Sequence, residues 1–148
     1  MNKYIVGIVV FFLLLAFVIV DRSINNHASE NVQNTAPSDK LVILWTSDNP
    51  SLAETMVFMY AHNAKRNGWF DEVTIIIWGP SAKLAADNEE IQAYIRRMME
   101  DGVKIEVCIA CAQMRGVETT LRELGYDVRG MGRPLTDYLK RGYRVLTF

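Results

Sequence analysis

The stretch KIEVCIACAQMRG, residues 104–116, carries the clearest fold signal and the clearest chemistry of this chain. Apolar residues alternate up to the first cysteine, which predicts a strand, and a run with helical character follows it. A buried strand that leads directly into a helix is the repeating unit of a parallel α/β sheet. The only two cysteines of the chain, Cys108 and Cys111, lie at this junction with the spacing C-x-x-C.

Four more segments have the pattern of short buried strands, and helical segments lie between them. These strands are predicted at 41–47, at 72–79, within 126–132 and at 143–148. Strands that alternate with helices are joined by right-handed crossovers. The sequence therefore predicts an α/β fold, a five-stranded parallel sheet with helices on both faces.

Three local expectations follow from the same patterns. His62 falls away from the apolar face of the first helix, which predicts an exposed side chain. A helical stretch after the cysteines is predicted to bend near Gly116. The first helix is predicted to start at Pro50 and to bury the face formed by Ala53, Met56, Val57, Tyr60, Ala61 and Ala64.

The N-terminal run YIVGIVVFFLLLAFVIV, residues 4–20, has no charged residue. As a helix it would span roughly 25 Å, near the lower limit for crossing a bilayer. Because Lys3 precedes it, the positive-inside rule places the N-terminus in the cytoplasm. We therefore predict that residues 1–20 are a transmembrane signal anchor, with a cleaved signal peptide and a buried core helix as the alternatives.

The remaining chain divides into a linker and a folded domain. Residues 21–39 are polar and rich in Asn and Ser, which predicts a flexible linker. Residues 40–148 then form the domain, on the periplasmic or outer side of the cytoplasmic membrane. The protein would be a single-pass membrane protein with its C-terminal domain outside the cytoplasm.

Composition argues against several classes of function. The 148 residues carry a net charge of −1 and no Lys/Arg run longer than two, which disfavours nucleic-acid binding. Two cysteines with His27 and His62 make a poor zinc ligand set. No glycine-rich nucleotide-binding motif follows the first predicted strand. We therefore expect neither a metal nor a cofactor.

Ligands of open parallel sheets bind at the carboxyl ends of the strands, where both cysteines are predicted to lie. The free N–H groups and the positive dipole end of the helix that follows would lower a cysteine pKa there. Arg115, one turn after Cys111, could hold a thiolate, a persulfide or sulfite. As the alternative, both cysteines are packing residues. The further candidate binding residues lie in the other loops at this edge: Ser47, Asp48, Asn49, Gly79, Gly132 and Arg133.

Three segments, LWTSDNPSLAETMVFMYAHNAKRNGWFDEVTIIIWGPS, VCIACAQMRGV and GMGRPLTDYLKRGYRVLTF, resemble the DsrE/DsrF-like family of the sulfur-relay superfamily. The resemblance covers residues 40–148. It implies a flavodoxin-like, three-layer α/β/α domain with a five-stranded parallel sheet, and assembly into homo-trimers or homo-hexamers. The sulfur carriers of this family hold a persulfide on one cysteine at the end of the third strand, which matches Cys108. Cys111 matches the second cysteine of the C-x-x-C branch, whereas the N-terminal anchor departs from these soluble relatives.

Three functional hypotheses follow. In the first, a membrane-tethered sulfur carrier exchanges sulfur with a partner protein or a small sulfur species. Cys108 would bear the persulfide, and Cys111 would resolve it or protect Cys108. In the second, the pair is a thiol–disulfide oxidoreductase. In the third, the protein is a non-enzymatic oligomeric binding module whose cysteines only pack, so the sequence leaves open whether the protein is an enzyme.

Overall fold

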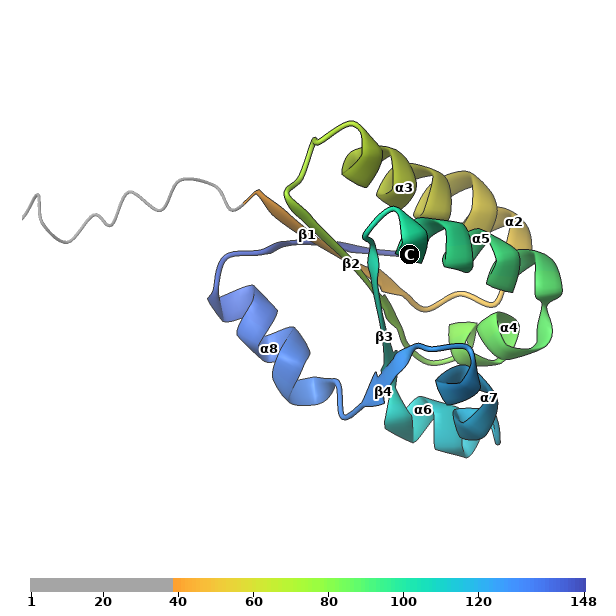
Figure 1. Ribbon diagram of the computed structural model, residues 1–148. Helices are drawn as coiled ribbons and strands as arrows, with labels where there is room; N and C mark the ends of the chain where they lie inside the picture. The colour runs from red at the N-terminus through yellow and green to blue at the C-terminus, as the bar shows by residue number, and fades with distance from the viewer. Residues whose placement is uncertain (1–38) are drawn as a thin grey trace, which may run out of the picture. The chain divides into compact units, whose positions relative to one another are not determined.

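The five strands of the sheet all run parallel, in the spatial order β4-β3-β2-β1-β5. The computed structural model describes residues 39–148, and Figure 1 shows the strands at the centre of this domain. The predicted five-stranded parallel sheet is thereby confirmed. The strands are β1 (Lys40–Trp45), β2 (Glu72–Ile77), β3 (Lys104–Cys108), β4 (Asp127–Arg129) and β5 (Arg144–Thr147).

Helices cover both faces of the sheet, but unequally. Every helix before β4 contributes to the core on one face, whereas α8 packs alone on the other (Figure 1). The domain therefore has the predicted three-layer α/β/α architecture. The helices are α2 (Pro50–Leu52), the π-helix η1 (Ala53–Phe58), α3 (Met59–Arg66), α4 (Ser81–Asp87), α5 (Glu89–Glu100), α6 (Ile109–Met114), α7 (Glu118–Glu123) and α8 (Gly132–Lys140).

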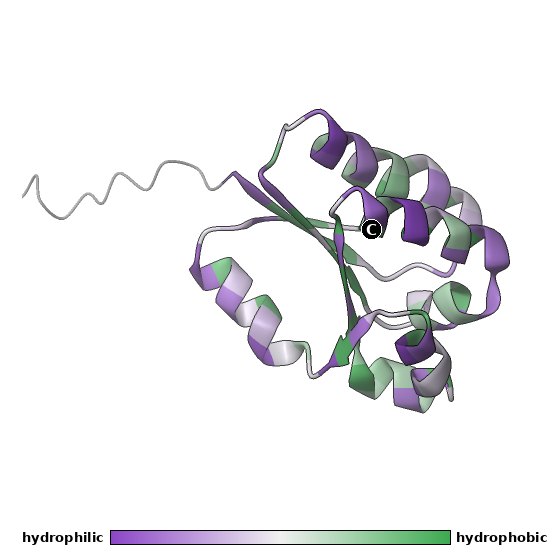
Figure 2. Cartoon of the chain, in the orientation of Figure 1, coloured by the Kyte–Doolittle hydropathy of each residue, from purple (hydrophilic) through white to green (hydrophobic). Residues whose placement is uncertain are grey.

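Side-chain alternation along the strands creates two different cores. On β3, Ile105 and Val107 point to the many-helix face, while Cys108 points to the α8 face. Figure 2 shows hydrophobic residues along the central strands and mixed residues on the helices. The larger core includes Trp45 and Phe58, whose rings meet edge to face with centroids 5.1 Å apart. The site described below lies where the smaller core reaches the carboxyl ends of the strands.

The first helix differs from the prediction because a π segment, η1, interrupts it. The amide of Met59 reaches back to the carbonyl of Glu54, an i→i+5 bond that fits an extra residue into the turn. This extra residue rotates the buried face. Phe58 becomes fully buried, whereas Met56 is 49% exposed and Tyr60 37% exposed. The prediction that Met56 and Tyr60 lie in the core was therefore wrong.

The bend predicted near Gly116 is confirmed. Helix α6 ends at Met114 and α7 begins at Glu118, with Gly116 between them at φ +68°. Only glycine adopts this left-handed conformation without strain, and it closes the end of a helix. The bend returns the chain to the start of β4.

His62 is a second correction. Its side chain is mostly buried, and its Nε2 lies 2.6 Å from a carboxylate oxygen of Asp101. Its ring also meets the ring of Tyr94 edge to face. The pattern of α3 alone could not reveal this, because both partners come from the α5 region. His62 therefore ties α3 to α5 and is not a free surface residue.

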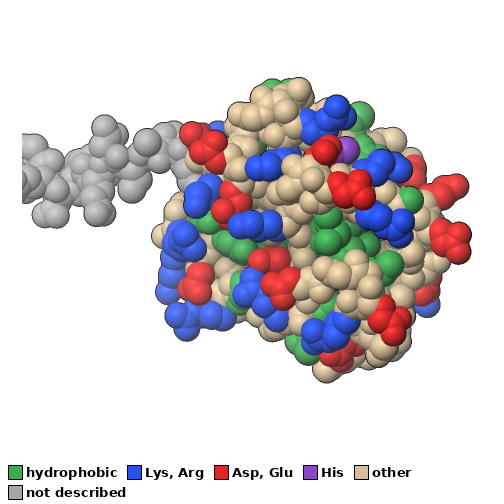
Figure 3. Space-filling view, in the orientation of Figure 1, with side chains coloured by type: hydrophobic (Ala, Val, Ile, Leu, Met, Phe, Trp, Pro, Cys, Tyr) green, Lys and Arg blue, Asp and Glu red, His purple; other side chains and the backbone are tan. Residues whose placement is uncertain are grey.

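The predicted anchor at 1–20 lies outside the described residues, as does nearly all of the predicted linker at 21–39. Within residues 39–148, no helix combines the length and apolar character needed to cross a bilayer. Acidic and basic side chains are interspersed over the face of the domain shown in Figure 3. This distribution agrees with the net charge of the chain, which is −1.

Candidate functional site

The two cysteines meet at the junction of β3 and α6. Cys108 ends the strand with an extended backbone, and Cys111 lies in the first turn of the helix. Both cysteines are free, and Cys111 packs against the small apolar cluster that contains Cys108. The C-x-x-C spacing therefore brings two thiols together at the carboxyl edge of the sheet.

Cys108 is the more buried thiol, with 6% of its surface exposed. Strand alternation directs its side chain to the α8 face, where it belongs to a small apolar cluster. Within the described residues, its side chain makes no capping hydrogen bond to α6. The expected contact between this thiol and the free N–H groups of the helix is therefore absent. The other buried members of the cluster are Val42, Ile76, Met131 and Tyr143.

Cys111 is partly exposed and lines a cavity of about 200 Å³ together with Gly79, Met114 and Arg115. Burial raises the pKa of the Cys111 thiol, and the neighbouring Cys108 thiol raises it further. A hydrogen bond from the Gly79 backbone and the charge of Arg115 act in the opposite direction without cancelling the rise. The predicted lowering of a cysteine pKa is thus wrong for Cys111, because desolvation outweighs the positive groups.

The loop after β2 holds the cavity wall in place. Gly79 has a φ of +74°, and its carbonyl accepts a 3.0 Å hydrogen bond from Nε of Arg115. The buried Ser81 hydroxyl accepts a hydrogen bond from the Trp78 amide and donates one of 2.7 Å to the carbonyl of Trp45. These bonds tie the ends of β1 and β2 to the start of α4. The arrangement fixes Gly79 and Arg115 beside Cys111.

The other predicted loop residues make different contacts in the structure. The Ser47 hydroxyl accepts from the Asn49 amide, and the Asn49 side chain caps α2. Asp48, between them, lines a second cavity that also contains Arg115.

Gly132 begins α8, and the Arg133 side chain is 86% exposed and paired with Asp137. Neither of these two α8 residues lines the cavities beside Cys111. Of the predicted binding residues, Gly79 and Arg115 line the cavity of Cys111, and Asp48 lines the second cavity, which shares Arg115.

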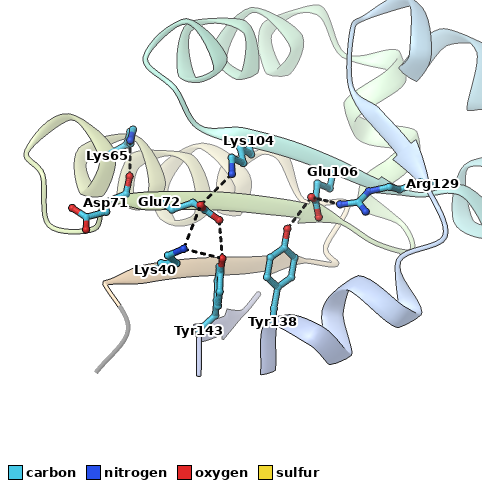
Figure 4. Close-up of polar contacts among 9 residues, drawn as sticks. All are labelled: Lys40, Lys65, Asp71, Glu72, Lys104, Glu106, Arg129, Tyr138 and Tyr143. Carbon is cyan, nitrogen blue, oxygen red and sulfur yellow. Dashed lines mark hydrogen bonds and ion pairs between the residues drawn. The ribbon is translucent and has the colours of Figure 1, made fainter. Parts of the chain in front are cut away.

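Sequence reasoning missed a buried carboxylate two residues before Cys108. Glu106 lies under α8 on the same sheet face, and Figure 4 shows the groups around it. Its Oε1 accepts hydrogen bonds from the Tyr138 hydroxyl at 2.9 Å and from Arg129 at 2.5 Å. Its Oε2 is buried and has no hydrogen-bond partner among residues 39–148. A lone acid between apolar strand residues was the signal that could have revealed this group.

This network changes the acidity of a tyrosine. Burial raises the pKa of Tyr138 to about 12, and the hydrogen bond to Glu106 and the charge of its carboxylate act in the same direction. A second carboxylate, Glu72, lies at the opposite end of the strands (Figure 4). Burial acts to raise its pKa, but hydrogen bonds from Lys104 and Tyr143 outweigh burial and leave the pKa lowered. The α8 face therefore contains two separate polar networks.

The described part of the chain contains no group of three or more His, Cys, Asp and Glu side chains placed to hold a metal ion. The polar groups that favour the charged form of the Cys111 thiol are the Gly79 backbone and the guanidinium of Arg115. These groups suit a negatively charged sulfur species better than a cation.

The sequence profile of the DsrE/DsrF-like family matches residues 39–148. The chain belongs to this family. A solved structure of a conserved protein of unknown function from Bacteroides thetaiotaomicron is 44% identical, with a TM-score of 0.72. The alignment covers 74% of this chain and 95% of that one. No curated protein matches this DsrE/DsrF-like chain. The comparisons thus show the family and the fold, and the family is of the sulfur-relay type.

Proposed function

We propose that this DsrE/DsrF-like protein carries sulfur as a cysteine persulfide on Cys108 and Cys111. The observation that supports the proposal most is the pair of free thiols packed in one cluster at the carboxyl edge of the sheet, one of them open to a cavity. This edge is where parallel α/β sheets bind their ligands. Arg115 supplies a positive charge beside the open thiol, as an anionic sulfur species requires.

The loading step requires no external oxidant. The Cys111 thiolate attacks the outer sulfur of a donor persulfide, R–S–SH. A new S–S bond forms, the S–S bond of the donor breaks, and the donor leaves as the thiolate R–S⁻. The product is Cys111–S–SH, and the thiolate is the reacting form because thiols are weak nucleophiles.

The two thiols then take different roles. Cys111 has the access that a donor needs, whereas Cys108 is buried among apolar side chains. In our proposal the Cys108 thiolate attacks the outer sulfur of Cys111–S–SH, which gives Cys108–S–SH and regenerates Cys111. The buried position shelters the stored sulfur from reductants. Attack on the inner sulfur instead releases hydrosulfide and leaves a Cys108–Cys111 disulfide, which needs an external dithiol for its reduction.

Intact-mass spectrometry of the full-length protein in detergent tests this function. After exposure to a persulfide donor and removal of excess reagent, the wild-type chain should gain the mass of one sulfur atom. Cys111→Ser should load more slowly, and Cys108→Ser should load but lose its sulfur faster to a reductant. A wild-type chain that gains no sulfur, or a Cys108→Ser adduct as long-lived as that of the wild type, contradicts the proposal.

The proposal includes single-pass anchoring by residues 4–20 and assembly into homo-trimers or homo-hexamers. The uncharged run supports anchoring, with the domain outside the cytoplasm. Exposed Met56, Met59, Trp69 and Leu146 line an apolar groove of about 420 Å³, which supports self-association. Membrane fractionation with protease protection tests the first expectation, and light scattering of the purified protein tests the second. Protein in the soluble fraction, or a monomer, contradicts them.

The proximity of the two free thiols also supports a second candidate, a thiol–disulfide oxidoreductase. Insulin reduction and the reduction potential of the pair separate the two functions. Exchange activity that needs both cysteines, without a stable sulfur adduct, favours the oxidoreductase. Sulfur loading that survives Cys111→Ser, although more slowly, favours the carrier.

A further inference from the structure

Two cavities adjoin at Arg115. The smaller one, of about 200 Å³, contains Cys111, and the larger one, of about 350 Å³, lies along α4. Both are lined by Arg115, and Gly79 of the first is followed in the chain by Pro80 of the second. A small molecule in contact with Cys111 therefore lies beside the same Arg115 side chain that lines the larger cavity.

The larger cavity carries both signs of charge. Arg115 and Lys83 supply two cations, and Asp48 and Asp87 supply two carboxylates. Lys83 and Asp87 form an ion pair one turn apart on α4, while Asp48 comes from the loop after β1. Arg115 uses its Nε on the carbonyl of Gly79. A simple anion would be attracted by the cations and repelled by the carboxylates, whereas a zwitterion matches both.

We propose that these adjoining cavities bind an amino-acid-type persulfide, a small sulfur donor with one ammonium and one carboxylate group, and present its outer sulfur to Cys111. This inference rests on the proposed sulfur-carrier function and names its donor. The donor carboxylate pairs with Arg115 and Lys83, and its ammonium group pairs with Asp48. The sulfur passes to Cys111 with release of the amino-acid thiolate, as written above.

The spacing along α6 agrees with this donor. Arg115 follows Cys111 by four residues, so the two positions lie about 6 Å apart along a helix axis. In cysteine persulfide, the outer sulfur and the carboxylate carbon are separated by a chain of four bonds, which spans a similar length. A donor of this kind can therefore reach the thiol and the guanidinium at the same time.

Loading rates of the full-length protein in detergent, followed by intact mass, test the inference. The donors are cysteine persulfide, N-acetylcysteine persulfide, which lacks the ammonium group, and inorganic polysulfide. Asp48→Asn should slow loading from cysteine persulfide roughly two- to fivefold, the effect of one exposed charge pair. The same substitution should not slow loading from the two purely anionic donors, because it removes a repelling carboxylate. A variant that loads more slowly from the zwitterionic donor, but not from the anionic donors, distinguishes recognition of a zwitterion from general attraction of anions.

Lys83→Gln is the second variant, and Arg122→Gln is its matched control. Arg122 forms a similar ion pair with Glu118 on α7, outside both cavities. Lys83→Gln should slow loading from cysteine persulfide roughly two- to fivefold, and Arg122→Gln should leave it unchanged. If Asp48→Asn and Lys83→Gln both load at the wild-type rate from cysteine persulfide while polysulfide still loads, the donor assignment is overturned and the carrier function stands. If no donor loads the wild type, the carrier function itself fails.

Discussion

The two faces of the sheet are built differently. On the many-helix face, residues of β1, β2 and β3 pack with seven other elements into one apolar core. On the α8 face, a small apolar cluster that includes Cys108 shares the sheet surface with the networks of Glu106 and Glu72. No residue of α8 itself is buried. The first face supplies most of the apolar burial that stabilises the domain, and the second face can therefore hold polar and reactive groups.

The two faces should differ most in their response to large-to-small substitutions. Phe58→Ala, in the larger core, should lower the free energy of unfolding by about 3–5 kcal/mol, because it leaves a cavity against Trp45. Leu135→Ala, its counterpart on the half-buried side of α8, should cost only about 1–2 kcal/mol. Chemical denaturation followed by tryptophan fluorescence measures both. Equal losses would show that α8 packs as tightly as the other helices.

The Glu106 network should show the next largest effect. Arg129→Gln should lower the free energy of unfolding by about 1–2 kcal/mol, because a buried carboxylate loses its charged donor. Tyr138→Phe should cost about 1 kcal/mol. Both groups donate to Oε1 of Glu106, so the double variant should deviate from additivity by about 0.5–1 kcal/mol. Strictly additive losses in the double-mutant cycle would contradict a shared network.

The stability of the domain at alkaline pH should depend on Tyr138. The folded state raises the pKa of Tyr138 from 10 to about 12, so it holds the proton more tightly than the unfolded chain. The contribution of Tyr138 to stability should therefore be fully present below pH 10 and should be lost as the pH rises towards 12. Tyr138→Phe should reduce this slope, and part of what remains should come from Tyr126, whose pKa burial also raises to about 12. Identical pH profiles for wild type and Tyr138→Phe would exclude this role.

The alkylation rate of Cys111 should depend on its neighbours Cys108 and Arg115. Cys108→Ala removes a thiol that raises the pKa of Cys111, so alkylation of Cys111 near neutral pH should accelerate several-fold. Arg115→Gln removes an opposing positive charge and should slow it, while Arg115→Lys should retain most of the wild-type rate. Iodoacetamide kinetics measured across a pH series report these shifts. A slower reaction in Cys108→Ala would mean that the neighbouring thiol activates Cys111.

The smallest effect is expected at the exposed ion pair of α4. Lys83→Gln should change the free energy of unfolding by no more than about 0.5 kcal/mol, since exposed i,i+4 pairs contribute little. Thermal unfolding of the wild type and the variant checks this. A clear loss of stability would make Lys83 a structural residue and remove its value as a probe of donor binding.

The fold and the thiol pair could be predicted for the same physical reason. Buried strands with helices between them specify a parallel sheet, and the ends of such strands place Cys108, Cys111 and Gly79 at one edge. The sequence pattern does not say which face each crossover covers, so it could not show that α8 packs alone. The sequence pattern also could not reveal the π segment η1, because no residue pattern in this stretch indicates its i→i+5 hydrogen bonds.

The Glu106 network was hidden for a different reason. Arg129 and Tyr138 lie 23 and 32 residues after Glu106, and they meet it only through strand order and the last crossover. The cavity beside Arg115 is similar, because Asp48 and Lys83 come from loops and helices that follow different strands. Local patterns predict elements, whereas groups assembled across the sheet require the three-dimensional arrangement.

The most direct test of the account is a time course that locates the added sulfur in the wild-type protein. Full-length chain would be mixed with cysteine persulfide, quenched by alkylation at successive times and fragmented in the mass spectrometer. We expect the sulfur on Cys111 at the earliest times and on Cys108 later, because Cys111 opens to the cavity and Cys108 is buried. Sulfur found first on Cys108, or retained on neither cysteine, would contradict the account.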